Sequence, residues 1–414
     1  MIDGEHYPPV VRDTLRELPY DVVAALFVGG TEKLRGNGDY GVPVVRDLDE
    51  AVAGYAPELL FDLSDEPVLG PRARLLLASR ALAHGLRYEG ADFRFDPPAL
   101  EPFPLPSLGI VGTGKRVGKT AVAGHVARLL AADREVVVVA MGRGGPAEPQ
   151  VAEGPPTLER LLELSRSGSH AASDYLEDAA FAGVVTIGCR RCGGGLAGMP
   201  VRSNVAAGAR LAAARSPDLV IFEGSGAALP PIATGRRILV ASAQQEPELL
   251  TGYLNAYRVL VSDLVVLTMA EDGSRHEEAR AALRRLKPGV PVIAVTLRPR
   301  PVEPVDGRRV AYFSTAPPAA LERLVGHLEA ECGAEVVHAS GSLADREALR
   351  AELESVRADV FLVELKAAAI DVVAETAAER GVEVVLADNE VCPLPEEDDL
   401  DGAVRALAAD PGPL

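Results

Sequence analysis

The sequence predicts an α/β protein of two or three domains built around mostly parallel sheets. Short apolar segments alternate with longer stretches of helical periodicity, which is typical of βαβ units. Two proline-rich stretches interrupt this alternation and mark candidate domain boundaries. A chain of 414 residues is also too long for one hydrophobic core of ordinary size.

The N-terminal part has short apolar segments at residues 24–30, 42–47 and 58–64, followed by a helical pattern over 71–86. The prolines of residues 96–107 cannot lie inside a helix or a central strand. We therefore expect an N-terminal α/β domain at residues 1–106. Its glycine turn after residue 28 is not a complete dinucleotide-binding motif.

The middle part reads as a complete doubly wound domain, because apolar segments alternate there with helix-length stretches. Strands are expected at residues 108–113, 135–143, 184–188, 219–226, 237–243, 264–269 and 291–297. A proline cluster at 297–307 is expected to end this domain, which we place at residues 107–303. Residues 304–414 repeat the alternation and form either a third small α/β domain or an extension of the second sheet.

Composition excludes several classes of function. The formal net charge of −18 argues against general affinity for nucleic acid or anionic membranes, because such binding needs basic surfaces. The four cysteines are too few for a disulfide framework, and no apolar run approaches the roughly 20 residues that span a bilayer. We therefore expect a cytoplasmic protein that binds neither nucleic acid nor membrane.

One segment carries the chemistry. Residues 108–130 combine a buried-strand pattern, a glycine-rich turn and an amphipathic helix that begins at Gly118 or Lys119. Backbone N–H groups and the helix dipole make such a turn a phosphate-binding loop. The predicted ATP-binding residues are Gly112, Thr113, Gly114, Lys115, Arg116, Val117, Gly118, Lys119 and Thr120. Thr113 stands where the strict GxxxxGK[ST] pattern has its first glycine.

Roles within this loop follow from residue type. Lys119 is predicted to reach the β and γ phosphates and Thr120 to ligate Mg²⁺. Lys115 and Arg116 add positive charge, and we predict that both are catalytic together with Lys119. Glu223 ends an apolar run at the carboxyl end of a predicted central strand, where open α/β sheets place ligands. It is the predicted carboxylate of the metal site, and a glutamate that only caps the strand is the alternative.

The loop GTGKRVGKT, together with the later EGSGAA, resembles dethiobiotin synthetase. This resemblance implies a P-loop NTPase domain of the dethiobiotin-synthetase-like branch, flanked by smaller α/β domains. The second lysine of that branch would fall at Gly114, whereas this chain has Lys115 one place later.

Five segments taken together resemble the cyclic 2,3-diphosphoglycerate synthetase family. They are VVVAMGRGGPAEP, SRSGSHAASDYLEDA, TIGCRRCGGGLAGMP, LVIFEGSGAALPP and VELKAAAIDV. The resemblance implies ATP-driven closure of 2,3-diphosphoglycerate into its cyclic pyrophosphate through a phosphorylated intermediate, with release of ADP and phosphate. ATP and Mg²⁺ are the expected cofactors, and a homodimer is the expected assembly.

A doubly phosphorylated substrate requires fixed positive charge. Unit charges about 4 Å apart repel by roughly 4 kcal/mol at an effective dielectric near 20, so cations must be in place before reaction. Arg143, Arg190 and Arg191 lie on predicted loops and are candidate substrate ligands, with solvated arginines as the alternative. Lys366, after a strand, and His170, near a predicted helix start, are further candidates for substrate binding.

Some residues and functions stay open. Cys189 and Cys192 form a CxxC, which is weak evidence for zinc because no second pair accompanies it. Glu148 and Asp174 are possible further metal contacts. An ATP-dependent ligase or kinase on another small anionic substrate remains an alternative function. A non-catalytic nucleotide switch that binds partner proteins is the other.

Overall fold

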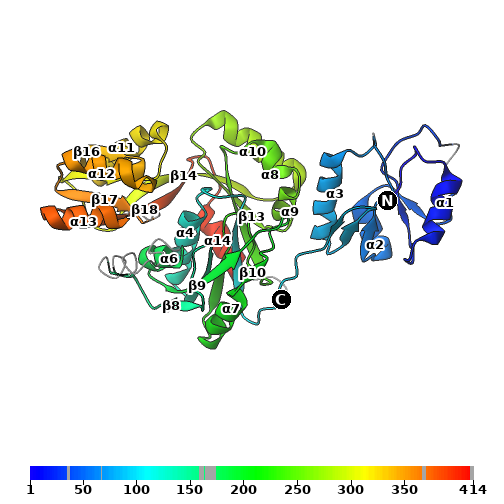
Figure 1. The fold of residues 1–414 in the computed structure, drawn as a ribbon, viewed down its shortest axis with the longest axis horizontal. Coiled ribbons are helices and arrows are strands. Elements are labelled where there is room, and N and C mark those ends of the chain that lie inside the picture. Colours follow the sequence, from blue (N-terminus) through cyan, green and yellow to red (C-terminus); the bar gives the residue numbers. More distant parts are fainter. Residues whose placement is uncertain (35–37, 67, 158–162, 164–173, 366–369, 411–414) are drawn as a thin grey trace. The chain divides into compact units, whose positions relative to one another are not determined.

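The computed structural model describes residues 1–34, 38–66, 68–157, 163, 174–365 and 370–410. Two compact units make up the chain. Unit 1 comprises residues 1–99, 246–261 and 281–289, and unit 2 comprises residues 100–245, 262–280 and 290–414. Figure 1 shows the elements of each unit. The domain boundaries expected after residues 106 and 303 remain predictions.

Unit 1 contains two short sheets and their helices. The elements are α1 (Pro8–Glu17), β1 (Ala25–Leu26), β2 (Val44–Val45), α2 (Leu48–Tyr55), β3 (Leu59–Phe61), α3 (Pro71–Ala83), β4 (Arg87–Glu89), β5 (Arg94–Phe95), α8 (Pro247–Thr251) and α9 (Asn255–Leu260). One sheet has the order β1-β2 and the other β3-β4-β5. Ile2 forms a parallel bridge with Phe27, and the backbone N–H of Leu63 donates to Met1 O. The first residues of the chain therefore run between β1 and β3.

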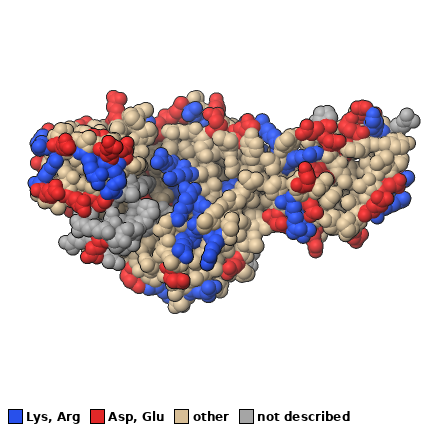
Figure 2. Space-filling model, viewed as in Figure 1, with Lys and Arg blue, Asp and Glu red and all other residues tan. Residues whose placement is uncertain are grey.

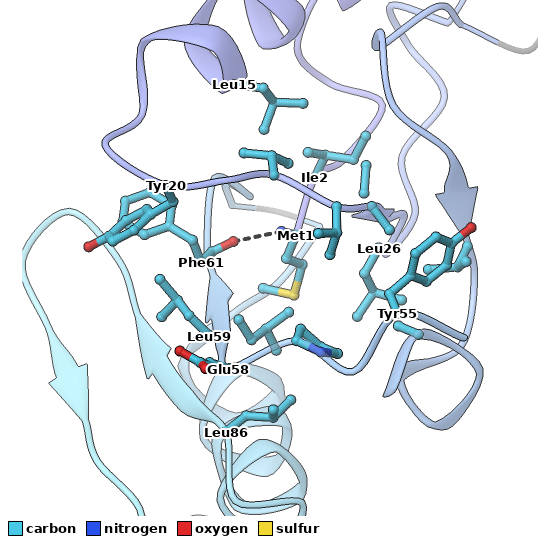
Figure 3. Close-up of a pocket in the computed structure, with 18 of the residues that line it drawn as sticks. Met1, Ile2, Leu15, Tyr20, Leu26, Tyr55, Glu58, Leu59, Phe61 and Leu86 are labelled. Carbon is cyan, nitrogen blue, oxygen red and sulfur yellow. Dashed lines mark hydrogen bonds between the residues drawn. The ribbon is translucent and has the colours of Figure 1, made fainter. Parts of the chain in front are cut away.

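Unit 1 also encloses an apolar cavity of about 480 Å³. Figure 3 shows its lining, in which Leu15, Leu26, Leu59 and Leu86 surround Met1. The Met1 ammonium donates a hydrogen bond to a backbone carbonyl 2.6 Å away. Among the described residues, none of the predicted site residues lines this cavity.

Unit 2 is organised by a single sheet of 13 strands. The strands are β6 (Ser107–Gly112), β7 (Val136–Gly142), β8 (Gln150–Ala152), β9 (Val185–Cys192), β10 (Arg202–Ser203), β11 (Leu219–Glu223), β12 (Arg236–Ser242), β13 (Leu264–Thr268), β14 (Val292–Pro301), β15 (Arg309–Phe313), β16 (Glu335–Ser340), β17 (Val360–Glu364) and β18 (Glu383–Pro393). Their order is β10-β9-β7-β11-β6-β12-β13-β14-β18-β17-β15-β16, and β8 pairs with β9. Strands β9 to β14 of this order are parallel, which confirms the expected α/β fold class.

Helices cover both faces of this sheet. They are α4 (Lys119–Ala131), α6 (Asp174–Ala182), α7 (Val205–Ala214), α11 (Pro318–Cys332), α12 (Arg346–Ser355), α13 (Ile370–Arg380) and α14 (Leu400–Ala409), with the short 3₁₀ helix η1 (Ser342–Ala344). Helix α10 (Gly273–Leu286) has residues in both units. One core contains residues of α4, α6 and α14, and a second core contains residues of α7. Every residue of β6, β7 and β11 is buried, as parallel strands covered on both faces require.

Strand β14 is longer than the sequence predicts. The strand was expected at residues 291–297, ahead of the proline cluster, but β14 continues through Pro299 to Pro301. Residues 292–294 pair with β13, whereas residues 295–301 pair only with the antiparallel β18. Proline lacks an N–H and is tolerated where one side of a strand has no neighbour. Strands β15 to β18 therefore continue the sheet.

Candidate active site

The predicted phosphate-binding loop connects β6 to α4. Strand β6 lies between β11 and β12 in the sheet, and Ile110 pairs with both Glu223 and Ile238. Helix α4 begins at Lys119, as the sequence predicts. The carboxyl ends of three parallel strands therefore meet at this loop, which is where such sheets place ligands.

The loop backbone includes two residues in the left-handed conformation. Arg116 and Gly118 have φ angles of +61° and +80°, in the left-handed region. A Cβ atom added to Gly118 would lie 2.7 Å from Leu297 Cδ1, so the position also requires glycine for space. Thr268 Oγ1 donates to Val117 O at 2.7 Å. The loop is thus held from outside by β13 and β14.

Thr113 replaces the first glycine of the strict motif, and the structure gives its side chain a partner. Its hydroxyl donates to Gln245 Oε1 at 2.5 Å, and its backbone N–H donates to Val240 O at 3.0 Å. Gln245 and Thr268 were not predicted as parts of the site. Neither has a sequence signal, because each acts on the loop from a distant strand end.

Lys119 and Glu223 form an ion pair at the base of the loop, between Lys119 Nζ and Glu223 Oε1. Lys119 is 8% exposed and Glu223 is completely buried. The second carboxylate oxygen, Glu223 Oε2, has no hydrogen-bond partner among the described residues. The two residues that the sequence assigns to phosphate and metal therefore lie in direct contact.

Asp178 is a buried carboxylate that the sequence reasoning missed. It lies on α6, is 2% exposed, and neither of its oxygens has a hydrogen-bond partner in the described part of the chain. Burial raises the pKa of the Asp178 carboxyl well above its usual range, and the adjacent Glu223 carboxylate raises that pKa further. Tyr175 and Leu176 are buried on the same helix. An aspartate among the apolar residues of this predicted helix was the sequence signal that could have identified Asp178.

These groups fit a magnesium ion bound together with a nucleotide. Among the described residues, no three His, Cys, Asp or Glu side chains are grouped so as to hold a metal alone. Magnesium is typically held by one or two carboxylates plus phosphate oxygens and water. The free oxygen of Glu223 and the half-buried Thr120, next to Lys119, match that donor set.

Arg143 and Arg191 come together beside the loop. A Cβ atom added to Gly226 would lie 2.7 Å from Arg143 Nη2 and 3.7 Å from Arg191 Nη2. Arg191 Nη1 and Nη2 donate to Gly193 O at 2.6 Å and Ser225 O at 2.8 Å. Gly226 in turn lies against the loop, because a Cβ atom added to Gly112 would be 2.8 Å from Gly226 O.

Arg190 does not join this pair. Both Arg190 and Arg191 were expected on a loop, but the structure places them in β9. Successive side chains of a strand point to opposite faces, so these neighbours serve different faces of the sheet. Arg190 is exposed, and its backbone N–H donates to Asn204 Oδ1 at 2.7 Å. The loop expected at Arg190 and Arg191 was therefore wrong, because both residues belong to a strand.

Positive charge gathers in this part of unit 2. Figure 2 shows lysine and arginine side chains in a band over the region where Figure 1 places β9, β14 and α4. Lys115, Arg116 and Arg143 are exposed. His170 and Lys366, both predicted to bind substrate, and the side chain of Asp174 lie outside the described residues.

The CxxC is no metal pair in this structure. Cys189 is buried and Cys192 is exposed, and they lie three positions apart on one strand, so they point to opposite faces. Burial raises the pKa of the Cys189 thiol to about 12. Glu148 is exposed after β7. In the described part of the chain, no helix is long and apolar enough to span a bilayer.

Three family models match this chain. They are the N-terminal, P-loop and C-terminal domains of cyclic 2,3-diphosphoglycerate synthetase, at residues 1–96, 107–294 and 301–390. Among solved structures, LpxK from Aquifex aeolicus in complex with ATP covers 74% of this chain and 90% of its own, at 13% identity and a TM-score of 0.43. That likeness is too low to carry an argument about function.

Similar proteins are known from bacteria and archaea under the name cyclic 2,3-diphosphoglycerate synthetase. The protein of Rubrobacter xylanophilus is 52% identical, over 99% of this chain and 96% of its own length. Those of Thermococcus gammatolerans and Methanothermus fervidus are 45% and 40% identical, each over 94% of this chain and over 92% and 91% of their own. These matches confirm the resemblance seen in the motifs, and the chain belongs to the cyclic 2,3-diphosphoglycerate synthetase family.

Proposed function

We propose that this chain closes 2,3-diphosphoglycerate into cyclic 2,3-diphosphoglycerate at the expense of ATP, releasing ADP and phosphate. The observation that carries this proposal is the match of all three domains to proteins named for that product. The phosphate-binding loop and the arginines beside it supply a site of suitable chemistry. An ATP-dependent ligase or kinase on another small anion, and a nucleotide switch, are the alternatives that the experiment below tests.

The chemistry requires ATP because a phosphate monoester is a poor electrophile when its leaving group is oxide. One substrate phosphate attacks the γ-phosphorus of ATP, forming an anhydride and expelling ADP. The other substrate phosphate then attacks the substrate's own phosphorus atom in this anhydride. The bond from that phosphorus to the transferred phosphate breaks, so inorganic phosphate leaves and the cyclic pyrophosphate remains. Both steps bring anions together, so fixed cations must stabilise the transition states.

The loop residues Gly112 to Thr120 are proposed to hold the ATP phosphates through backbone N–H groups. Lys119, at the first position of α4, is proposed to neutralise the transferring phosphoryl group. Lys115 and Arg116 are exposed on the same turn and are proposed to stabilise charge that develops outside the loop. Arg116 has a left-handed backbone conformation, which is strained for a residue other than glycine and is often found at functional sites.

Magnesium, when bound with ATP, supplies Lewis-acid stabilisation of the phosphate oxygens. Thr120 and Glu223 are proposed to hold it, since Thr120 adjoins Lys119 and Glu223 has an unpartnered oxygen. The ion pair between Lys119 and Glu223 keeps both side chains in place at the base of the loop. These residues therefore fix the positions of the positive charges before reaction.

Arg143 and Arg191 are proposed to bind the substrate phosphates. Arg191 has two hydrogen bonds to backbone carbonyls, so its guanidinium is already oriented, and planar guanidinium groups suit phosphate oxygens. Arg190, His170 and Lys366 remain proposed substrate ligands from the sequence. A homodimer in the cytoplasm is likewise proposed, and light scattering of the purified protein tests the assembly.

Phosphorus NMR of the purified protein with Mg-ATP and 2,3-diphosphoglycerate tests the function. We expect the cyclic pyrophosphate signal to grow together with one ADP and one inorganic phosphate per ring closed. ATP hydrolysis at equal rates with and without the substrate, and no cyclic product, would contradict the proposal. A different phosphorylated or ligated product would indicate another ligase or kinase. Stimulation only by a partner protein would indicate a nucleotide switch.

A further inference from the structure

Asp178 is the buried charged group of this site that the proposed roles leave without a function. Helix α6 carries it into the interior, where its side chain is 2% exposed. Its carboxyl group faces the Glu223 carboxylate, and no N–H or hydroxyl donor among the described residues reaches either of its oxygens. Buried carboxylates in proteins are normally paired, hydrogen-bonded or bound to metals. A purely structural aspartate at this depth would be expected to accept hydrogen bonds.

The surroundings of Asp178 are rich in negative charge. Its carboxyl group adjoins that of Glu223, and Lys119 is the nearby cation. Glu177, the preceding residue, is buried as well and adds further negative charge near Asp178. One ammonium group balances only one of the two adjacent carboxylates. The arrangement therefore favours an additional positive charge between Asp178 and Glu223.

We propose that Asp178 joins Glu223 in holding the divalent cation of the nucleotide site. This inference rests on the proposed function, because the cation accompanies ATP there. Two elements supply the carboxylates: Glu223 ends β11, and Asp178 lies on α6. The unpartnered oxygens of both side chains lie next to Lys119, which directly precedes Thr120. Two carboxylates, a threonine hydroxyl and phosphate oxygens form a donor set that suits magnesium.

Mn²⁺ binding, followed by electron paramagnetic resonance with ADP present, tests this assignment without relying on turnover. Asp178→Asn removes the charge and keeps the size of the side chain. We expect its Mn²⁺ affinity to fall about tenfold to a hundredfold, as loss of groups that support a metal site commonly causes. Glu177→Gln is the matched control, because it makes the same chemical change at the next buried position of α6. Its Mn²⁺ affinity should stay within about twofold of wild type.

Unchanged Mn²⁺ affinity in Asp178→Asn would overturn the proposal, and a simultaneous loss of thermal stability would assign Asp178 a structural role. An equal loss in Glu177→Gln would also overturn it, since the effect would then be general electrostatics. ADP affinity measured in EDTA confirms that each variant is folded, and Asp178→Ser replaces any asparagine variant that is not. The proposed activity is tested separately. If the wild-type protein forms no cyclic product with Mg-ATP, the activity is refuted, whereas the Mn²⁺ comparison still shows whether Asp178 binds the cation.

Discussion

Replacing Lys119 by methionine should destabilise the protein as well as inactivate it. The side chain is 8% exposed and pairs with the fully buried Glu223, so Lys119→Met leaves a buried carboxylate without its cation. Removing one partner of a buried ion pair typically costs about 3–5 kcal/mol. For domains of 150–250 residues this corresponds to a fall in Tm of roughly 6–20 °C. A lysine that only touched nucleotide would leave Tm unchanged.

The neighbouring carboxylates should respond unequally to the same kind of change. Glu223→Gln should cost less than Lys119→Met, because Asp178 remains as a charged neighbour of the ammonium. Asp178→Asn should leave Tm unchanged or raise it when no metal is present, because burial, and after it the adjacent Glu223 carboxylate, disfavours the charged form of Asp178 and raises its pKa. The double variant Lys119→Met with Asp178→Asn should recover part of the stability lost by Lys119→Met alone.

Thermal unfolding in EDTA, followed by circular dichroism and by calorimetry, measures this order. The purified variants are compared at one pH and without nucleotide, so that no ligand contributes to Tm. A Tm for Lys119→Met within about 2 °C of wild type would refute the assigned burial of the pair. Destabilisation of Asp178→Asn as large as that of Lys119→Met would refute the repulsion between the two carboxylates.

Arg191→Ala should lower kcat/KM for 2,3-diphosphoglycerate roughly tenfold to a hundredfold, from the loss of a charge-assisted contact of about 1.5–3 kcal/mol, with the dissociation constant of an ATP analogue unchanged. Arg190→Ala is the matched comparison on the opposite face of the sheet, and its kcat/KM should fall less. Equal losses of kcat/KM would contradict the special role of Arg191. At pH 8 a thiol reagent should modify the exposed Cys192 quickly and Cys189 only on unfolding, because burial raises the pKa of Cys189 to about 12. Labelling is quantified by mass spectrometry, and fast labelling of both cysteines would contradict the burial of Cys189. Gly118→Ala should weaken nucleotide binding and cost at least about 1–2 kcal/mol in the left-handed backbone alone, and calorimetric titration with an ATP analogue that showed wild-type affinity would refute the constraint.

The phosphate-binding loop could be predicted because its signal is local. A strand, a turn and a helix start follow one another in sequence, so the position of Lys119 did not depend on the rest of the fold. Glu223 could be placed as well, since an apolar run that ends in a carboxylate predicts a side chain at a strand end. The contact between the two residues confirms that β6 and β11 are neighbours.

The other groups around the loop depend on tertiary structure. Asp178 reaches Glu223 only because α6 packs beside the sheet, and Gln245 reaches Thr113 from the end of β12. Neither residue belongs to a motif whose spacing predicts such a contact. The arginines at 190 and 191 were misplaced for another reason: the glycines after Cys192 suggested a loop, although β9 continues to that cysteine.

An acidic chain serves an acidic substrate only if its cations are fixed in the right places. Net charge is −18, so mobile surface arginines would pair with surface carboxylates as readily as with substrate. Arg191 differs, because two backbone carbonyls hold its guanidinium and the glycine at 226 lets Arg143 approach it. Oriented charge of this kind needs little reorganisation when phosphates come together. Arg191, which backbone carbonyls hold and which lies close to Arg143, is therefore a stronger candidate for substrate recognition than Arg190, although the sequence places Arg190 and Arg191 side by side.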